Sequence, residues 1–328
     1  MPEFISTEAY SAPVLHPMAE KVARSSARLK PLEESTPIQA RALRKAKGNP
    51  FAPPSCDLYK IEDRQIKTSQ GLISLRIYTP AALKPVSNIG SATALAGLVF
   101  FHGGGFVVGS VQQYDTLTQQ LAYHSGCVVV SVDYKLAPEF KSGAIYRQGY
   151  DAYHWFRENC ADYNVDKNRI AVGGDSAGAN LAIAVSQLCQ IHGTALPAFQ
   201  QLIYPVTDWS MSAQSIEDFA EGYFLTKGAM GWFREHFLEP DTALDNSLVS
   251  PLHASLESMP PSMVLTAGFD PLRDEGKAFA EKLSSAGVVV QHLCYTDMIH
   301  GFLSFAGGIP AGMQALEALG KMLKEELT

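Results

Sequence analysis

The sequence feature that most constrains the fold is a series of short apolar segments that alternate with helical patterns from residue 95 onward. Segments such as 98–101 and 169–173 lack the alternation of polar and apolar residues that marks a half-exposed strand. Strands of this kind are buried on both faces, which is typical of a mostly parallel sheet with helices on each side. The sequence therefore predicts an α/β fold. The expected strands cover 98–101, 127–133, 169–173, 201–205, 263–267 and 288–295, and the expected helices cover 115–124, 144–160, 180–192, 272–286 and 313–327.

Residues 1–50, which precede this alternation, have helical patterns. A second helix in this region is expected to start at Thr36-Pro37, because threonine is a good N-cap and proline suits the first helical position. It is expected to end near Gly48. One face of the first helix is marked at helical spacing by Val14, Leu15, Met18 and Val22.

Two strand-like runs follow, at residues 59–68 and 72–79, and Ser69-Gln70-Gly71 between them is a hairpin signal. The sheet is therefore expected to open with an antiparallel pair. Residues 81–94 are rich in Ala, Ser, Pro and Gly and are predicted to form an exposed loop. Between residues 208 and 249, aromatic and helical segments replace the strand-helix alternation, which predicts an insertion above the sheet that covers a pocket.

Composition excludes several classes of protein. A chain of 328 residues with 46% hydrophobic and 18% charged residues can bury one large core. The net charge of −7 and the shortness of the basic clusters argue against a nucleic-acid partner. The longest apolar stretch, 95–109, contains His102 and several glycines, so stable membrane insertion is not expected.

The five cysteines are scattered and odd in number, which predicts free, mostly buried thiols. The chain has no Cys-x-x-Cys pair and no secretory signal at its amino terminus. These features favour a reducing, cytoplasmic location.

The pentapeptide Gly174-Asp175-Ser176-Ala177-Gly178 stands between an expected strand and an expected helix. Glycines two residues before and two after the serine allow a tight turn that exposes the hydroxyl, which makes Ser176 a candidate nucleophile. The motif alone is weak evidence, because it arises by chance in roughly one chain in ten of this length. An oxyanion loop, an acid and a histidine at other strand ends are needed to support it.

A second motif, His102-Gly103-Gly104-Gly105-Phe106, directly follows the strand at 98–101. Three successive glycines leave backbone N–H groups free to bind a substrate oxygen. We assign this oxyanion role to the N–H groups of Gly104, Gly105 and Ala177, and Gly103 is a further candidate. The alternative is a flexible loop without function.

Asp270 follows the strand at 263–267, and His300 follows the strand at 288–295. A carboxylate in that position can orient an imidazole, although a plain N-cap is the alternative interpretation of Asp270. The order serine, acid, histidine along the chain is that of an α/β-hydrolase. Other acids and histidines are expected to be structural, since they lie inside helices or strands: Asp274, Glu275, His154 and His292.

Six motifs in this order resemble those of the bacterial hormone-sensitive-lipase-like esterases, also called family IV lipolytic enzymes. The resemblance extends from about residue 59 to the carboxyl terminus, roughly four-fifths of the chain. Two departures are Ala179, where the family usually has glycine, and residues 140–143, where it often has a Phe-Pro pair. The motifs are HGGGF at 102–106, DYKLAPE at 133–139, GDSAG at 174–178, YPVTD at 204–208, DPLRDEG at 270–276 and HGF at 300–302.

The resemblance implies an α/β-hydrolase fold with a helical cap, made of residues 1–50 and 209–247 over a core of residues 51–208 and 248–328. It implies that Ser176, Asp270 and His300 form a catalytic triad that needs no cofactor and no metal. The expected partner is a small ester with a short or medium acyl chain. The expected pocket residues, which are alternatively the hydrophobic core of the cap, are Phe106, Trp209, Phe219, Tyr223, Phe224, Phe302 and Leu303.

Two other functions fit the same motifs. Related enzymes on this fold cleave amides such as N-acetyl arylamines with the same triad. A hydrolase-like fold can also act as a small-molecule receptor after losing its base, but His300 argues against this. Sheet edges and cap surfaces are candidate contacts for a homodimer.

Overall fold

The structure is a computed structural model that describes residue 12, residues 14–81 and residues 94–328. The loop expected at 81–94 therefore lies almost entirely outside the described residues, as does most of the segment before residue 14. The sheet strands are β1 (Lys60–Thr68), β2 (Gly71–Thr79), β3 (Leu95–Phe101), β4 (Val128–Asp133), β5 (Val165–Asp175), β6 (Gln200–Ile203), β7 (Ser262–Phe269) and β8 (Val290–Ile299).

These strands form one eight-stranded sheet in the order β1-β2-β4-β3-β5-β6-β7-β8. The β1–β2 and β2–β4 pairs are antiparallel, and every later pair is parallel. The hairpin closes with Thr68 opposite Gly71, as the turn signal predicts. The expected α/β architecture with an antiparallel opening is confirmed.

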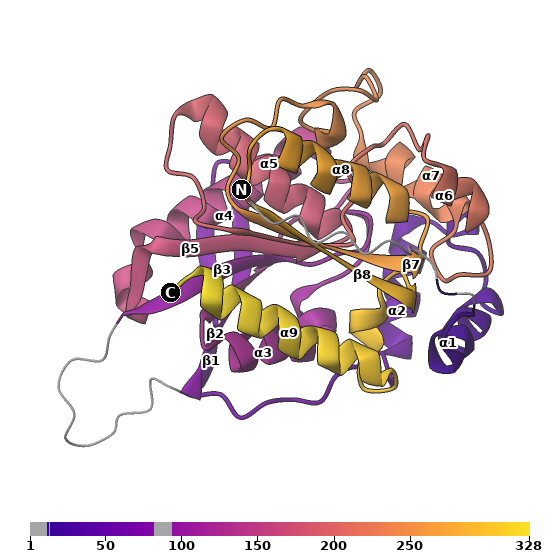
Figure 1. Ribbon diagram of the computed structural model, residues 1–328, viewed down its shortest axis with the longest axis horizontal. Helices are drawn as coiled ribbons and strands as arrows, with labels where there is room; N and C mark the ends of the chain where they lie inside the picture. The colour runs from indigo at the N-terminus through magenta and orange to yellow at the C-terminus, as the bar shows by residue number, and fades with distance from the viewer. Residues whose placement is uncertain (1–11, 13, 82–93) are drawn as a thin grey trace.

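Helices cover both faces of the sheet (Figure 1). Successive strand residues point to opposite faces, so Leu98 and Phe100 of β3 pack toward α3 and α9, whereas Val99 and Phe101 pack toward α4, α5 and α8. This two-sided burial explains why the parallel strands are apolar throughout. The helices are α1 (Pro17–Ala27), α2 (Pro37–Lys47), α3 (Val111–Ser125), α4 (Ser142–Glu158), α5 (Ala177–His192), α6 (Gln214–Asp218), α7 (Lys227–Phe237), α8 (Arg273–Ser285) and α9 (Pro310–Glu326).

The first helix differs from the prediction at its start. It begins at Pro17, with His16 as the N-cap, so Val14 and Leu15 lie before it and Val14 is 74% exposed. The reason is that proline lacks the N–H that a helix interior needs and is tolerated only in the first turn. The second helix follows the prediction, since the Thr36 side chain accepts the Gln39 N–H and Gly48 ends the helix.

Four helices, α1, α2, α6 and α7, lie together at one end of the sheet, beyond the arrowheads of β7 and β8 (Figure 1). The short 3-10 turn η1 (Leu32–Glu34) contacts the start of α7, where a Cβ on Gly228 would meet a Glu33 carboxylate oxygen at 2.2 Å. The segments before β1 and after β6 are therefore packed against each other. Ligands of parallel α/β sheets bind at the carboxyl ends of the strands, where these helices lie.

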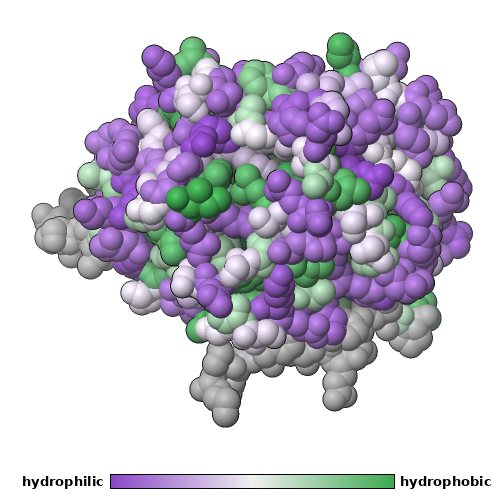
Figure 2. Space-filling view, turned by 90° about the horizontal axis from the view of Figure 1, so that it is seen from above, coloured by the Kyte–Doolittle hydropathy of each residue, from purple (hydrophilic) through white to green (hydrophobic). Residues whose placement is uncertain are grey.

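The face of the molecule in Figure 2 is mostly hydrophilic, with hydrophobic side chains in small separate groups. Among the helices of the described residues, none has the length and apolar character needed to cross a bilayer.

Candidate active site

Ser176 occupies a sharp turn between the end of β5 and the start of α5. Its φ of 56° lies in the left-handed region, which costs energy for a residue with a side chain. The flanking glycines permit the turn, because a Cβ on Gly178 would lie 1.9 Å from the Phe101 carbonyl oxygen and one on Gly174 would lie 2.4 Å from Gly178. The turn thus presents the Ser176 hydroxyl at the carboxyl end of the sheet.

His300 joins Ser176 to Asp270. Its Nε2 lies 3.0 Å from the Ser176 Oγ, and its Nδ1 lies 2.7 Å from the Asp270 Oδ2. Asp270 is fully buried and its other oxygen accepts the Leu272 N–H at 2.8 Å. The three side chains come from the ends of β5, β7 and β8, so the sheet brings together residues that are up to 124 positions apart in the chain. In this arrangement the imidazole can take the serine proton while the carboxylate orients the ring.

The two neighbouring acids have other partners. Asp274 pairs with Arg273 and accepts the Ser215 N–H. Glu275 is buried and accepts the N–H groups of Thr207 and Asp208 in the turn after β6, and burial raises its pKa well above the ordinary value. Glu275 therefore holds the turn that contains Thr207 and Asp208. Its position in the first turn of a helix indicates only an interaction with the helix dipole.

The glycine loop after β3 presents three backbone N–H groups near Ser176. No hydrogen bond among the described residues uses the N–H of Gly104, Gly105 or Ala177. Gly104 and Gly105 have φ values of 115° and 60°, so side chains at these positions would be strained. The N–H of Gly103 instead donates to the Asp175 Oδ1 at 2.7 Å, contrary to the expectation that it is a further free donor.

Asp175, the residue before the nucleophile candidate, holds this loop in place. Besides the Gly103 N–H, its carboxylate accepts the Tyr114 hydroxyl at 3.0 Å. Burial raises the pKa of Asp175 to about 6, because the hydrogen bonds only partly offset the loss of hydration. Asp175 is not among the site residues predicted from the sequence, although its place inside the GDSAG motif is a usable signal.

The elevated pKa of Asp175 predicts how stability depends on pH. Its value rises from 3.8 to about 6 in the folded protein, so the folded state holds the proton more tightly than the unfolded chain. Stability from this group is therefore lost as the pH rises from about 4 to about 6, by roughly 3 kcal/mol. We expect the free energy of unfolding of Asp175→Asn, relative to wild type, to increase by about this amount between pH 4 and pH 7 in urea titrations. A difference that stays constant over this range would contradict the prediction.

A small cavity of about 20 Å³ adjoins Ser176. One of its walls belongs to α7, where Phe233 packs so closely on the glycine loop that a Cβ on Gly105 would lie 2.1 Å from the ring. A space of this size holds one or two water molecules. The lining residues are Gly105, Ser176, Val206, Asp208, Trp209, Leu225, Met230, Phe233 and Leu272.

Of the seven aromatic and apolar residues predicted to line the pocket, Trp209 lies at this cavity. The other six pack elsewhere, which corrects that prediction. Large aromatic rings gain more by stacking on one another than by facing a small cavity. Phe106 stacks on Phe237, Phe219 and Tyr223 pack on Phe269, Phe224 packs on Phe305, and Phe302 and Leu303 are fully buried.

Three residues of the insertion that line the cavity, Leu225, Met230 and Phe233, are not among the residues predicted from the sequence. Met230 and Phe233 are three positions apart on α7 and therefore share a helix face, which is the only signal that the sequence contains for them. Among the described residues, no group of three or more His, Cys, Asp or Glu side chains could hold a metal ion.

A serine at a strand-helix elbow, a histidine and an acid in this chain order on a mostly parallel sheet define an α/β-hydrolase. Comparison with known proteins agrees, since the model of the α/β-hydrolase fold family matches residues 98–304. The carboxylic ester hydrolase LipN of Mycobacterium tuberculosis is 37% identical over 78% of this chain and 68% of its own length. The chain therefore belongs to the hormone-sensitive-lipase-like carboxylesterases of the α/β-hydrolase superfamily.

Further relatives and solved structures are similar over most of the chain. The ethyl acetate hydrolase of Pseudomonas putida is 35% identical over 81% of this chain and 83% of its own length. A thermostable esterase from Pseudomonas putida has a TM-score of 0.87 at 34% identity, over 97% of this chain and 99% of that one. An ester hydrolase from a lake metagenome has a TM-score of 0.89 at 34% identity, over 95% of this chain and 99% of that one.

Proposed function

We propose that this protein hydrolyses small esters with short acyl groups through a covalent acyl-enzyme, with Ser176 as nucleophile, His300 as base and Asp270 as the residue that orients it. The observation that carries the proposal is the double contact of His300, at 3.0 Å from Ser176 and 2.7 Å from Asp270. Ester hydrolysis by the ethyl acetate hydrolase of Pseudomonas putida, a relative at 35% identity, supports the same chemistry.

In the proposed first stage, the Nε2 of His300 removes the Ser176 proton as Oγ attacks the ester carbonyl carbon. The developing oxyanion accepts hydrogen bonds from Gly104, Gly105 and Ala177. Removing one such donor costs about 3 kcal/mol, roughly 100-fold in rate. His300 then protonates the leaving alkoxide as the C–O bond breaks.

In the second stage, water enters where the alcohol left and loses a proton to His300 as it attacks the acyl carbon. Collapse of this second intermediate returns the proton to Ser176 Oγ and releases the acid. The buried carboxylate of Asp270 stabilises the imidazolium in both stages.

The cavity beside Ser176 restricts the acyl group. At about 20 Å³ it is closed by Leu225, Met230 and Phe233 from the segment after β6. An acetyl methyl fits this space, whereas each further methylene requires displacement of a packed side chain. Within the expected range of short to medium acyl groups, we therefore propose that acetyl and propionyl esters are preferred.

A series of p-nitrophenyl esters tests this proposal. We expect kcat/KM to be highest for acetate or propionate and to fall by about tenfold or more at octanoate. Phe233→Ala removes the wall above Gly105 and should move the optimum to longer acyl chains. Tyr150→Ala is the control, because Tyr150 packs on His154 and on His192 at the far end of α5 from Ser176 and should leave the acyl preference unchanged. A wild-type optimum at long-chain esters would contradict the proposal.

We further propose the division into a cap of residues 1–50 and 209–247 and a core of residues 51–208 and 248–328. The cavity lining by Leu225, Met230 and Phe233 supports the cap role of the second segment. Glu33 in the first segment contacts Gly228 in the second segment, which supports assigning both segments to one cap.

We also propose a cytoplasmic location and consider a homodimer. All five cysteines are free thiols, which supports a cytoplasmic location. A homodimer would use β8, which is the last strand in the sheet order, although the N–H groups of Ala12 and His16 already bond to its residues Thr296 and Asp297. Sedimentation velocity tests the dimer, and a monomer at all concentrations would exclude it.

A further inference from the structure

The outer face of α2 is apolar and exposed. Ile38 is 72% exposed and Leu43 is 59% exposed, and Ala42 and Ala46 lie between them on the same side of the helix. At 100° per residue, these four side chains span about 140° of the helix surface, and Gln39 is the one polar residue within this arc. An apolar face this wide normally packs on a protein core.

The opposite face of α2 already has its contacts. Ala40 is buried, and the Arg41 guanidinium donates to the carbonyl oxygens of Val107 and Ala137 at 2.8 and 2.5 Å and pairs with Glu139. The helix is therefore anchored beside the oxyanion loop by one face, which leaves the apolar face directed outward.

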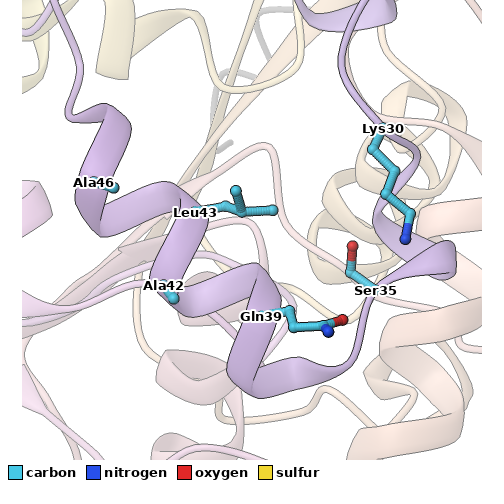
Figure 3. A pocket seen from close by; sticks show the side chains of 6 residues that line it. All are labelled: Lys30, Ser35, Gln39, Ala42, Leu43 and Ala46. Carbon is cyan, nitrogen blue, oxygen red and sulfur yellow. The ribbon is translucent and has the colours of Figure 1, made fainter.

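An open groove of about 440 Å³ extends from this face to the segment between α1 and η1. In Figure 3 the Leu43 and Gln39 side chains of α2 point across the groove toward Lys30 and Ser35. Leu29, next to Lys30, is 50% exposed. We call the outer face of α2 together with Leu29 and Lys30 the α2 surface.

The segment of the chain that carries the α2 surface has a charge opposite in sign to that of the whole chain. Residues 14–50 contain eight of the 26 Lys and Arg residues but only three of the 33 Asp and Glu residues, a local charge of +5 in a chain of −7. Lys45 and Lys47 are exposed and flank the apolar stripe of α2, and Lys30 faces it across the groove. None of the ion pairs of the described residues involves these three lysines.

We propose that the α2 surface docks reversibly on an anionic lipid surface, with Leu29, Ile38 and Leu43 entering the headgroup region and the lysines contacting lipid phosphates. Apolar side chains flanked by lysines on an amphipathic helix are the features that bind a helix to a bilayer interface. Basic residues add electrostatic attraction to anionic headgroups. An anionic lipid surface is complementary in charge to Lys30, Lys45 and Lys47 and can accept the apolar side chains that lie between them.

Vesicle co-sedimentation tests the proposal without depending on catalysis. The wild-type protein should bind phosphatidylcholine vesicles that contain about 30 mol% phosphatidylglycerol at least tenfold more strongly than phosphatidylcholine alone. Binding should weaken in about 0.5 M NaCl, because salt screens the lysines. The double variants Ile38→Glu with Leu43→Glu, and Lys45→Glu with Lys47→Glu, should each lose at least tenfold in binding.

The matched control is Ile191→Glu with Leu72→Glu, two residues outside the α2 surface with similar exposures of 67% and 58%. This control should bind like wild type, and all variants should hydrolyse soluble p-nitrophenyl acetate at the wild-type rate, which verifies folding. Equal binding of wild type and Ile38→Glu with Leu43→Glu would overturn the proposal, as would the absence of anionic selectivity. Lipid-free self-association that this variant abolishes would assign the surface to a second copy and would also overturn it.

Discussion

Replacing Ser176 with alanine is expected to lower kcat for p-nitrophenyl acetate by roughly 10⁴- to 10⁶-fold. The alanine keeps the strand-helix turn but removes the hydroxyl that lies 3.0 Å from His300 Nε2, so no acyl-enzyme can form. The rate that remains would come from the oxyanion donors and from substrate binding. Steady-state kinetics with the purified variant measure the loss, and circular dichroism verifies that the variant is folded.

Ser131→Ala is the matched control for this experiment. Ser131 is a buried serine as well, but it lies in β4 and its hydroxyl has no hydrogen-bond partner in the described residues. Removing this hydroxyl should leave kcat within about twofold of wild type. Substantial hydrolysis by Ser176→Ala, or a comparable loss in Ser131→Ala, would show that the elbow serine is not the nucleophile.

The second large effect is expected for Asp270→Asn, about 10⁴-fold in kcat at neutral pH. Asp270 accepts a hydrogen bond from His300 Nδ1 at 2.7 Å, which leaves Nε2 unprotonated and able to accept the serine proton. An asparagine amide that donates to Nδ1 would favour the opposite tautomer, in which Nε2 carries the proton and faces Ser176. The loss should appear mainly in kcat, because Asp270 is not among the residues that line the cavity.

Asp274→Asn is the appropriate control, because this acid lies four residues further along the chain and contacts Arg273 and Ser215 rather than His300. Its kcat should stay within about threefold of wild type, with a modest loss of stability from the weakened ion pair. The reverse result, a large effect at Asp274 and a small one at Asp270, would contradict the assignment of the acid.

The parts of the fold that could be predicted from the sequence are those in which burial produces a regular pattern of apolar residues. The parallel strands are apolar at consecutive positions because helices cover both faces, and the prediction of an α/β fold relies on that pattern. The ends of elements were less predictable. Strand β8 continues to Ile299, beyond the expected end at residue 295, because Thr296 and Asp297 interrupt the apolar run while the backbone stays extended through the buried Met298 and Ile299. Its extension places His300 directly at the strand end.

The candidate triad was predictable because each member follows an apolar strand, and parallel strands bring their carboxyl ends to one edge. The pocket was not predictable in this way. An aromatic side chain of the insertion can face either the substrate or another ring. Which of the two it faces depends on how α7 packs on the glycine loop, where Phe233 contacts Gly105. No periodicity within either segment records the contact, so Phe233 was missed and Phe219, Tyr223 and Phe224 were assigned wrongly to the pocket.

The same contact links the insertion to the glycine loop after β3. Phe233 covers Gly105 and Phe237 stacks on Phe106 at 3.9 Å, so two residues of α7 hold two consecutive residues of the loop. From the other side, Asp175 holds Gly103. The loop that presents the free N–H groups is therefore fixed by both the insertion and the nucleophile turn, which keeps its donors in position before substrate binds.

In the proposed mechanism, Ser176 forms a covalent bond with the acyl group. Peptide mass spectrometry after incubation with a fluorophosphonate probe tests it most directly, because the probe phosphonylates an activated serine and stops at that stage. We expect one adduct per chain, on the peptide that contains Ser176, and no adduct in the Ser176→Ala variant. An unlabelled active enzyme, or an adduct at another residue, would contradict the claim.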